Sequence, residues 1–217
     1  MCEGGQVDAA RLACFDLDNT LIDRDGAFLA WARWFVGRVG VESDAVEWLV
    51  AHDNGGFRGR AELFARFEER FGVAISVEEY DREHPLFTWV EPAVLDGLVR
   101  LRAAGWRVAV VTNGTVLQQT AKLQHTGIAQ AVDYCCISAA VGVRKPQREI
   151  FERAAAGAGA TLDGGWMVGD HPAYDIAGGI AAGLRTIRIG HHHAADTPAA
   201  DHDLDSVVEA FDVILAG

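Results

Sequence analysis

Seven polar side chains that could perform hydrolytic chemistry come directly after short apolar runs or just before the helices that follow them. Carboxylates can act as nucleophiles or as general acids and bases, and they supply the hard oxygen ligands that Mg²⁺ prefers. A lysine adds positive charge and a threonine adds a hydroxyl donor, and both suit an anionic substrate. The seven residues are Asp16, Asp18, Thr112, Asn113, Lys145, Asp170 and Asp175. We expect them to form one site if folding brings the ends of the runs together.

The apolar runs have the length and composition of buried parallel strands, and helical segments alternate with them. This alternation predicts an α/β fold with a doubly wound, Rossmann-like parallel sheet. Such a sheet collects its ligand site at the carboxyl ends of the strands. The expected strands are Leu12–Phe15, Val108–Val111, Tyr134–Ile137, Trp166–Val168 and Arg185–Ile189. The expected helices are Pro92–Ala104, Pro146–Gly157 and Pro172–Ala182.

The stretch 24–89 interrupts the alternation and has a helical pattern throughout. Its apolar side chains recur at helical spacing, as at Phe28, Trp31, Phe35 and Val39. We expect an all-helical cap over 24–89, inserted into a catalytic core made of 1–23 and 90–217. A helical subdomain without a role in substrate binding is the alternative. We favour the cap because both of its junctions lie close to the strand ends that carry the polar residues.

The motifs and their order closely resemble those of the haloacid dehalogenase (HAD) superfamily. The family motif DxDx(T/V) matches Asp16-Leu17-Asp18-Asn19-Thr20, and the Thr or Ser at a second strand end matches Thr112. The family lysine matches Lys145, and the acidic GDxxxD-type motif matches Gly169-Asp170-His171-Pro172-Ala173-Tyr174-Asp175. The resemblance runs from about Leu12 to Ile189 and includes the position of the inserted helical cap.

The resemblance implies a magnesium-dependent phosphatase that forms a phosphoryl-aspartate intermediate. Asp16 would be the nucleophile, and Lys145 would pair with Asp16 and with a phosphate oxygen. Asp18 would protonate the leaving alkoxide and then activate water as a base. Thr112 and the backbone N–H of Asn113 would bind the phosphate. Capping, turn and surface roles are the structural alternatives for the same residues.

The same resemblance implies a Mg²⁺ site built from the acidic residues. Asp16, Asp170 and the backbone carbonyl of Asp18 would be ligands. Asp175 belongs to the same site, where we expect it to orient the waters or Asp170 rather than to bind the ion directly.

The substrate is expected to be a small phosphate ester. A cap of this size suits small molecules, and the pattern of residues 169–189 resembles the nucleotidase and sugar-phosphatase branch of the family. This favours a nucleoside monophosphate or a sugar phosphate. Arg58 and Arg60 flank Gly59 in a predicted loop of the cap, so one of them is expected to contact the non-reacting part of the substrate. A pair of solvated arginines is the alternative.

Other reactions remain as alternatives. Dehalogenases of the family lack the second aspartate, so Asp18 argues against them, and a phosphonatase would need a cap lysine that 24–89 does not contain. Phosphomutases share Asp18 and stay possible. A non-catalytic phosphate-sensing module is the alternative from another class, although such domains lack a helical insertion. No GxGxxG follows the first strand, which disfavours a nicotinamide-binding enzyme.

The composition limits the partners. The net charge is −12, and no basic stripe is present that could bind a nucleic-acid polymer. No apolar run has the length of a signal peptide or a membrane span, so a cytoplasmic protein is expected, and the oligomeric state is left open. Lys122 is expected to be a solvated helix residue. The segment Gly190–His202, with His191–His193, is expected to be a surface loop.

Overall fold

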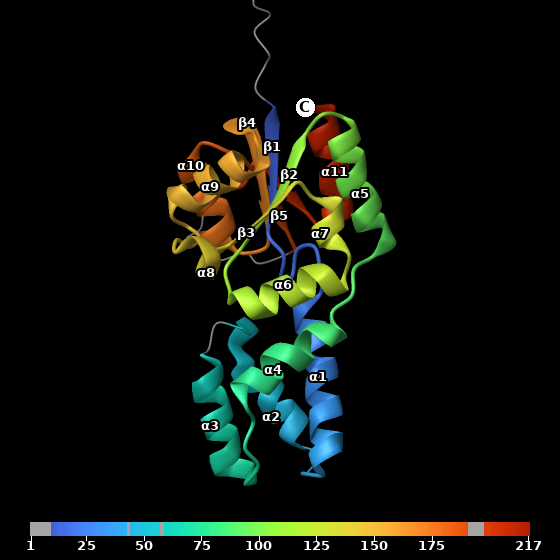
Figure 1. Ribbon diagram of the computed structural model, residues 1–217, viewed down its shortest axis with the longest axis vertical. Coiled ribbons are helices and arrows are strands. Elements are labelled where there is room, and N and C mark those ends of the chain that lie inside the picture. The colour runs from blue at the N-terminus through green and yellow to red at the C-terminus, as the bar shows by residue number, and fades with distance from the viewer. Residues whose placement is uncertain (1–9, 43, 57–58, 191–197) are drawn as a thin grey trace, which may run out of the picture.

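The computed structural model describes residues 10–42, 44–56, 59–190 and 198–217. Its centre is a six-stranded sheet with the order β3-β2-β1-β4-β5-β6, and all five neighbouring pairs are parallel (Figure 1). The predicted α/β fold with a doubly wound parallel sheet is therefore confirmed. The strands are β1 (Arg11–Phe15), β2 (Arg107–Thr112), β3 (Tyr134–Ile137), β4 (Thr161–Gly169), β5 (Arg185–Ile189) and β6 (His202–Leu204).

Both faces of the sheet are buried under helices. Because side chains alternate along a strand, Ala13 and Phe15 of β1 enter one core, whereas Leu12 and Cys14 enter the other. Helices α5 and α11 cover the first face, and α9 and α10 cover the second (Figure 1). The helices of this part are α5 (Pro92–Ala103), α6 (Val116–His125), α7 (Ile128–Ala131), α8 (Ser138–Val141), α9 (Arg148–Ala158), α10 (Ala177–Ala182) and α11 (Val207–Ala216).

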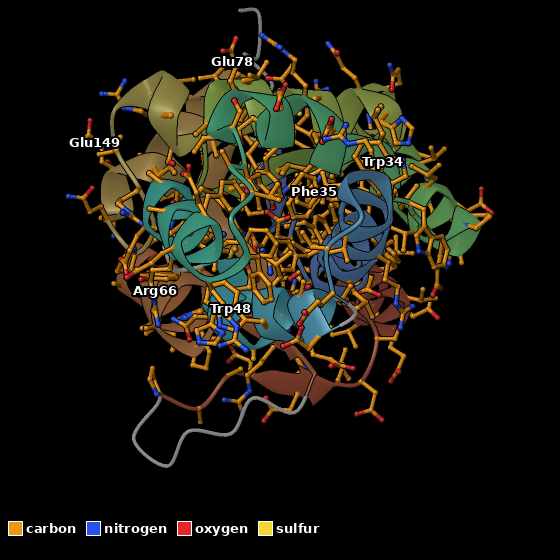
Figure 2. All side chains as sticks on the ribbon, turned by 90° about the horizontal axis from the view of Figure 1, so that it is seen from below. Trp34, Phe35, Trp48, Arg66, Glu78 and Glu149 are labelled. Atoms are coloured by element: carbon orange, nitrogen blue, oxygen red, sulfur yellow. The ribbon has the colours of Figure 1, made fainter. Side chains whose placement is uncertain are left out.

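The segment after β1 forms a separate helical unit with its own apolar core. It lies beyond the carboxyl ends of the strands (Figure 1). Phe28, Trp31 and Phe35 point from one face of α1 into this core, as their spacing predicts, and Figure 2 shows Phe35 between the helices. The unit consists of α1 (Arg24–Val39), α2 (Asp44–Asp53), η1 (Asn54–Gly56), α3 (Arg60–Phe71), α4 (Val77–Glu83) and η2 (His84–Phe87).

The strand order places the candidate residues side by side. β1 lies between β2 and β4, and the carboxyl ends of all three strands face the helical unit (Figure 1). The backbone N–H of Asp16 donates to the Val168 carbonyl at 2.9 Å, which extends the ladder by one residue beyond β1. The motif that begins at Asp16 and the motif that contains Asp170 are therefore held next to each other by main-chain hydrogen bonds.

Several element boundaries differ from the expectation. The helix expected from Pro146 begins at Arg148, because a turn closed by the Gln147 N–H and the Arg144 carbonyl precedes it. The helix expected from Pro172 is one π-helical turn, Pro172–Ile176, followed by α10.

The C-terminal part also differs. The loop expected up to His202 ends where that residue opens β6, which adds an edge strand to the sheet, and α11 follows. His191–His193 lie outside the described residues. None of the described helices combines the length and the apolar character needed to cross a bilayer.

Candidate active site

An acidic cluster with one buried lysine lies at the ends of β1 and β4. Carboxylate oxygens of Asp16, Asp170 and Asp175 lie within 4.8 Å of one another. The Lys145 ammonium lies 2.6 Å from Asp16 Oδ1 and 2.7 Å from Asp175 Oδ1. Lys145 and Asp175 are buried, so this lysine supplies positive charge to the cluster where water cannot. The fold thus brings together four of the predicted residues from three separate parts of the chain.

Burial and mutual repulsion perturb the carboxyl groups of the cluster. Burial, followed by the charge of Asp175 and Asp18, outweighs the Lys145 ammonium and raises the pKa of Asp16 to about 7. Burial and the charge of Asp16 and Asp175 raise the pKa of Asp170 to about 8. The pKa of Lys145 is raised despite its burial, because the carboxylates of Asp16 and Asp175 stabilise its charged form. The cluster therefore has too little positive charge of its own to keep all its carboxyls ionised at neutral pH.

The end of β2 supplies a hydroxyl and a brace for the lysine. Thr112 is buried, and its Oγ1 accepts a hydrogen bond from Gln119 Nε2 at 2.6 Å. The Asn113 side chain accepts from the Lys145 backbone N–H at 2.9 Å and donates to the Lys145 carbonyl at 3.2 Å. The Asn113 side chain thus fixes the loop that carries Lys145, and only its backbone N–H remains as a candidate phosphate ligand.

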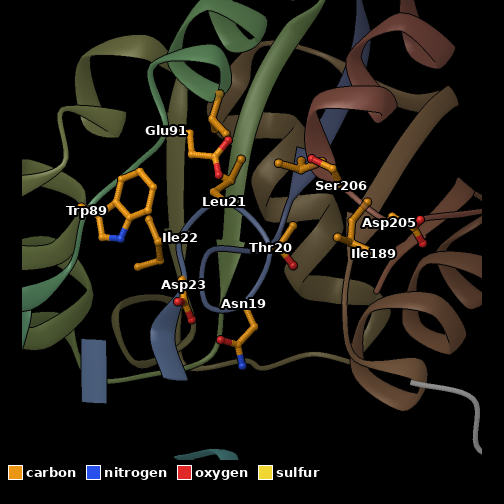
Figure 3. A pocket seen from close by; sticks show the side chains of 12 residues that line it. Asn19, Thr20, Leu21, Ile22, Asp23, Trp89, Glu91, Ile189, Asp205 and Ser206 are labelled. Atoms are coloured by element: carbon orange, nitrogen blue, oxygen red, sulfur yellow. The ribbon is translucent and has the colours of Figure 1, made fainter. Parts of the chain in front are cut away.

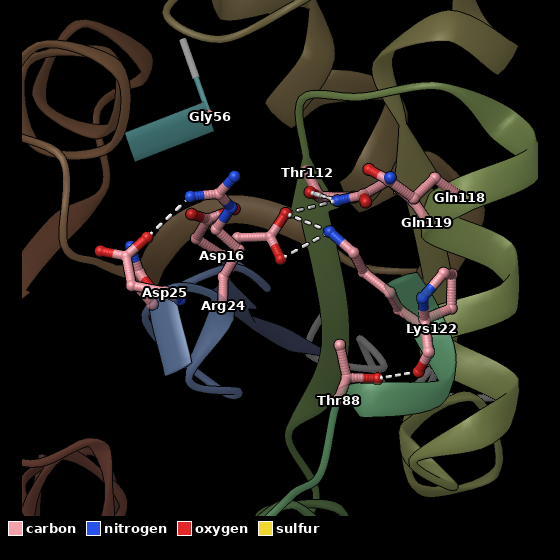
Figure 4. Close-up of polar contacts among 12 residues, drawn as sticks. Asp16, Arg24, Asp25, Gly56, Thr88, Thr112, Gln118, Gln119 and Lys122 are labelled. Atoms are coloured by element: carbon pink, nitrogen blue, oxygen red, sulfur yellow. Dashed lines mark hydrogen bonds and ion pairs between the residues drawn. The ribbon is translucent and has the colours of Figure 1, made fainter. Parts of the chain in front are cut away.

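Lys122 is part of the site, and its expected position as a solvated helix residue is wrong. Its ammonium lies 2.8 Å from Asp18 Oδ1 and 2.9 Å from Oδ2, and the residue is 2% exposed. Gln119 Nε2 donates to Asp18 Oδ2 at 3.0 Å as well as to Thr112. Figure 4 shows both side chains extending from α6 toward the strand end that carries Thr112.

The position of α6 explains why Lys122 is buried. The helix begins four residues after β2 ends, so it crosses the carboxyl edge of the sheet. Gln119 and Lys122 lie three residues apart and therefore share a face of the helix. This spacing, in a chain with only two lysines, was the feature of the sequence that could have indicated Lys122 as a site residue. Burial would raise the pKa of Asp18, but the Lys122 ammonium and its hydrogen bonds outweigh this effect and lower it.

Two arginines of the helical unit face the acidic cluster across a cleft. Arg24 opens α1 and Arg60 opens α3, and both pair with Asp53 at the end of α2. Arg24 also donates to Asp25 (Figure 4). The Gly56 N–H donates to Asp53 Oδ2 at 3.0 Å. The buried Asp53 carboxylate therefore binds both guanidinium groups and the backbone of the turn at Gly56. Arg24 was not predicted as a site residue, and Arg58 lies outside the described residues.

The cleft between the helical unit and the sheet has a volume of about 1070 Å³. Besides the acidic cluster, polar side chains line the cleft, and they include Arg24, Arg60, Asp81, Gln118 and His171. A smaller cavity of about 280 Å³ lies behind the loop that follows Asp18, with Trp89, Glu91 and Ser206 in its wall (Figure 3). The smaller cavity contains none of the acidic cluster, so the larger cleft is the candidate active site.

The acidic cluster fits a hard divalent cation. The oxygen donors of Asp16 and Asp170 suit such an ion, which would offset the burial and the mutual repulsion that raise the pKa values of both groups. Asp175 is engaged differently, because its carboxylate pairs with Lys145 and its Oδ2 accepts from the His171 backbone N–H at 3.0 Å. These contacts suit a residue that orients the ligands.

The fold and the cleft define an α/β protein with an acidic, cation-binding type of site at the carboxyl edge of its sheet. A family model described as haloacid dehalogenase-like hydrolase matches residues 10–183. The chain therefore belongs to the haloacid dehalogenase-like hydrolases, as the motifs predicted.

Two curated relatives are phosphatases. A phosphoserine phosphatase from Thermus thermophilus is 31% identical over 180 residues, which cover 82% of this chain and 64% of the relative. A glyceraldehyde 3-phosphate phosphatase from Methanopyrus kandleri is 32% identical over 148 residues, 65% of this chain and 64% of the relative. The chain thus spans slightly less than two thirds of the length of these relatives.

The fold also matches solved structures of the family. A HAD phosphatase from Thermococcus onnurineus superimposes with a TM-score of 0.68 at 23% identity, over 94% of this chain and 97% of that chain. At this level of identity the structural similarity supports the fold only, and the reaction has to be inferred from the residues of the site.

Proposed function

We propose that the chain is a magnesium-dependent phosphatase that hydrolyses a small, polar phosphomonoester through a phosphoryl-aspartate on Asp16. The observation that carries the proposal is the pairing of Asp16 with Lys145 at 2.6 Å beside a second aspartate, Asp18, that has its own buried lysine. A carboxylate that attacks a phosphate dianion needs compensating positive charge, and a basic leaving group needs a separate acid. Lys145, together with a cation held by the acidic cluster, would meet the first need, and Asp18 would meet the second.

In this mechanism the tasks are divided among the residues of the cleft. Asp16 attacks the phosphorus, and Asp18, in its protonated form, gives its proton to the leaving alkoxide and becomes a carboxylate. Thr112 and the Asn113 backbone N–H bind the phosphate oxygens, while Lys145 holds Asp16. A bound cation would be held by Asp16, Asp170 and the Asp18 carbonyl, and it would neutralise charge on the phosphate. Asp18 then serves as the base for the water that hydrolyses the intermediate.

We further propose that residues 24–89 form a cap over the cleft, with residues 1–23 and 90–217 as the catalytic core. Arg60 from the cap faces the cleft and is available to the non-reacting part of the substrate. The polar wall supports a nucleoside monophosphate, a sugar phosphate or a similarly polar metabolite. The curated relatives, named for phosphoserine and glyceraldehyde 3-phosphate, support the same class of small phosphate esters.

The proposal is tested by turnover of an aryl phosphate and of a panel of metabolite phosphates, with magnesium and with excess chelator. We expect magnesium-dependent release of phosphate, and a phosphoryl-enzyme that rapid acid quench traps. Asp16→Asn is expected to abolish both, whereas Asp163→Asn, at an exposed carboxylate of β4, serves as the matched control. Full turnover in chelator, or by Asp16→Asn, would refute the covalent mechanism. Transfer of phosphate within a sugar phosphate, instead of its release, would favour a phosphomutase.

A further inference from the structure

Three hydrogen bonds from one helix hold the carboxylate of Asp18. Lys122 Nζ contacts both carboxylate oxygens, at 2.8 and 2.9 Å, and Gln119 Nε2 contacts Oδ2 at 3.0 Å. Both α6 residues are almost fully buried, at 2% and 1% exposure, whereas the Asp18 side chain retains 27%. The carboxylate is therefore gripped from the protein side and open toward the cleft.

We propose that Lys122 and Gln119 are positioning residues that hold the Asp18 carboxylate in the orientation needed for acid–base chemistry. The inference rests on the proposed function, in which Asp18 serves the leaving group and the water. General acid catalysis requires the carboxyl group within hydrogen-bond reach of the oxygen that it protonates. An aspartate side chain rotates about two bonds. The contacts that Lys122 and Gln119 make with both carboxylate oxygens fix both torsion angles.

The surrounding charges explain why Asp18 needs such a grip. Asp18 lies two residues from Asp16, and Arg24 faces the same cleft. Without Lys122, the carboxylate could turn toward a bound cation or toward Arg24, because each offers it a positive partner. Among the described residues, Asp18 is the one carboxylate that forms an ion pair with Lys122. Lys122 thus gives the Asp18 carboxylate a positive partner that belongs to the protein itself.

Two consecutive residues near the start of α6 fix the helix that holds Asp18. Gln119 Nε2 also donates to Thr112 at the end of β2, so the position of Asp18 is tied to that of the phosphate-binding hydroxyl. The preceding residue, Gln118, donates to Asp81 of α4 at 3.1 Å. Helix α6 therefore connects the acid–base residue to the phosphate site on one side and to the helical unit on the other.

The test compares Lys122→Met, Asp18→Asn and the double variant on an alkyl phosphate and on an aryl phosphate. An alkyl leaving group needs protonation, whereas an activated aryl leaving group needs little. We expect Lys122→Met to lower kcat/KM, which covers the steps up to departure of the leaving group, by about 100-fold for the alkyl ester and by less than about tenfold for the aryl ester. In the Asp18→Asn background the same substitution should change kcat/KM by less than about twofold, since a positioning residue has nothing left to position. Gln124→Met, at an exposed site of α6, is the matched control.

Equal losses on both esters, or the same loss with and without Asp18, would overturn the proposal. Crystal structures of the wild-type protein and of Lys122→Met provide a readout that needs no turnover. We expect Asp18 to change its rotamer in the variant, and an unchanged, ordered carboxylate would also overturn the proposal. If the wild-type protein hydrolyses neither ester, the proposed function fails, while the structures still decide whether Lys122 positions Asp18. Lys122→Gln replaces the methionine variant if the latter does not fold.

Discussion

Replacing Lys145 by methionine removes the positive charge from the most buried part of the candidate site. The ammonium lies 2.6 Å from Asp16 Oδ1 and 2.7 Å from Asp175 Oδ1. At an effective dielectric constant of about 20, each contact corresponds to roughly 6 kcal/mol of gross attraction. Most of this attraction offsets the desolvation of the three charges. Breaking a buried pair on one side typically costs about 3–5 kcal/mol, and we expect a loss of this size in the free energy of unfolding.

The loss should depend on pH, because protons can replace the missing ammonium. Without Lys145, the pKa of Asp16 in the folded state rises further above its value in the unfolded chain. A carboxyl group with a raised folded-state pKa binds a proton that the unfolded chain has released, so stability falls as the pH rises toward that pKa. The variant should therefore lose about 3–5 kcal/mol at pH 8 and less at pH 6. Bound magnesium should restore part of the loss, since it binds the folded state.

Urea unfolding of both proteins in chelator, at pH 6 and at pH 8, measures this difference. Arg153→Met is a suitable control, because Arg153 forms an exposed pair with Glu149 that is expected to contribute less than about 0.5 kcal/mol. A loss of the same size at both pH values would refute the proton-replacement argument. A loss below about 1 kcal/mol would refute the claim that Lys145 compensates buried charge.

Three further predictions follow from other parts of the molecule. Because the pKa values of Asp16 and Asp170 are about 7 and 8, magnesium binding at pH 7 should release protons, and the affinity should increase as the pH rises to about 8. Calorimetry in two buffers would detect the proton release, and a pH-independent affinity would contradict the prediction. Arg60→Ala should lower kcat/KM for the best substrate by at least about tenfold, whereas Arg66→Ala on the exposed side of α3 should not. Equal kcat/KM values for the wild-type protein and Arg60→Ala would mean that Arg60 is only a structural partner of Asp53. A Cβ at Gly97 would lie 2.1 Å from the Phe211 ring, so Gly97→Ala should destabilise the protein by about 1–3 kcal/mol, whereas Gly37→Ala, which meets nothing within 4 Å, should not lower stability.

The larger part of the fold followed from local patterns. The five expected strands exist, because short apolar runs between polar turns suit a sheet that helices cover on both faces. The helical spacing of Phe28, Trp31 and Phe35 likewise places them in one apolar core. Strand β6 and helix α11 were not predicted. β6 is short and has a polar sequence, and its three residues are a strand only because β5 offers them a free edge.

The sequence by itself determined the residue types of the site and their order along the chain. Asp16, Asp18, Thr112, Lys145 and Asp170 were named from their positions after strands, because the ends of parallel strands meet at one edge of a sheet. The family resemblance also implied that Lys145 pairs with Asp16, 129 residues away in the chain. Only the tertiary structure decided that Lys122 faces Asp18, because these residues are 104 apart and no local pattern could show the pair. Lys122 is buried because α6 crosses the sheet edge beneath the helical unit, and this placement depends on packing between segments distant in sequence.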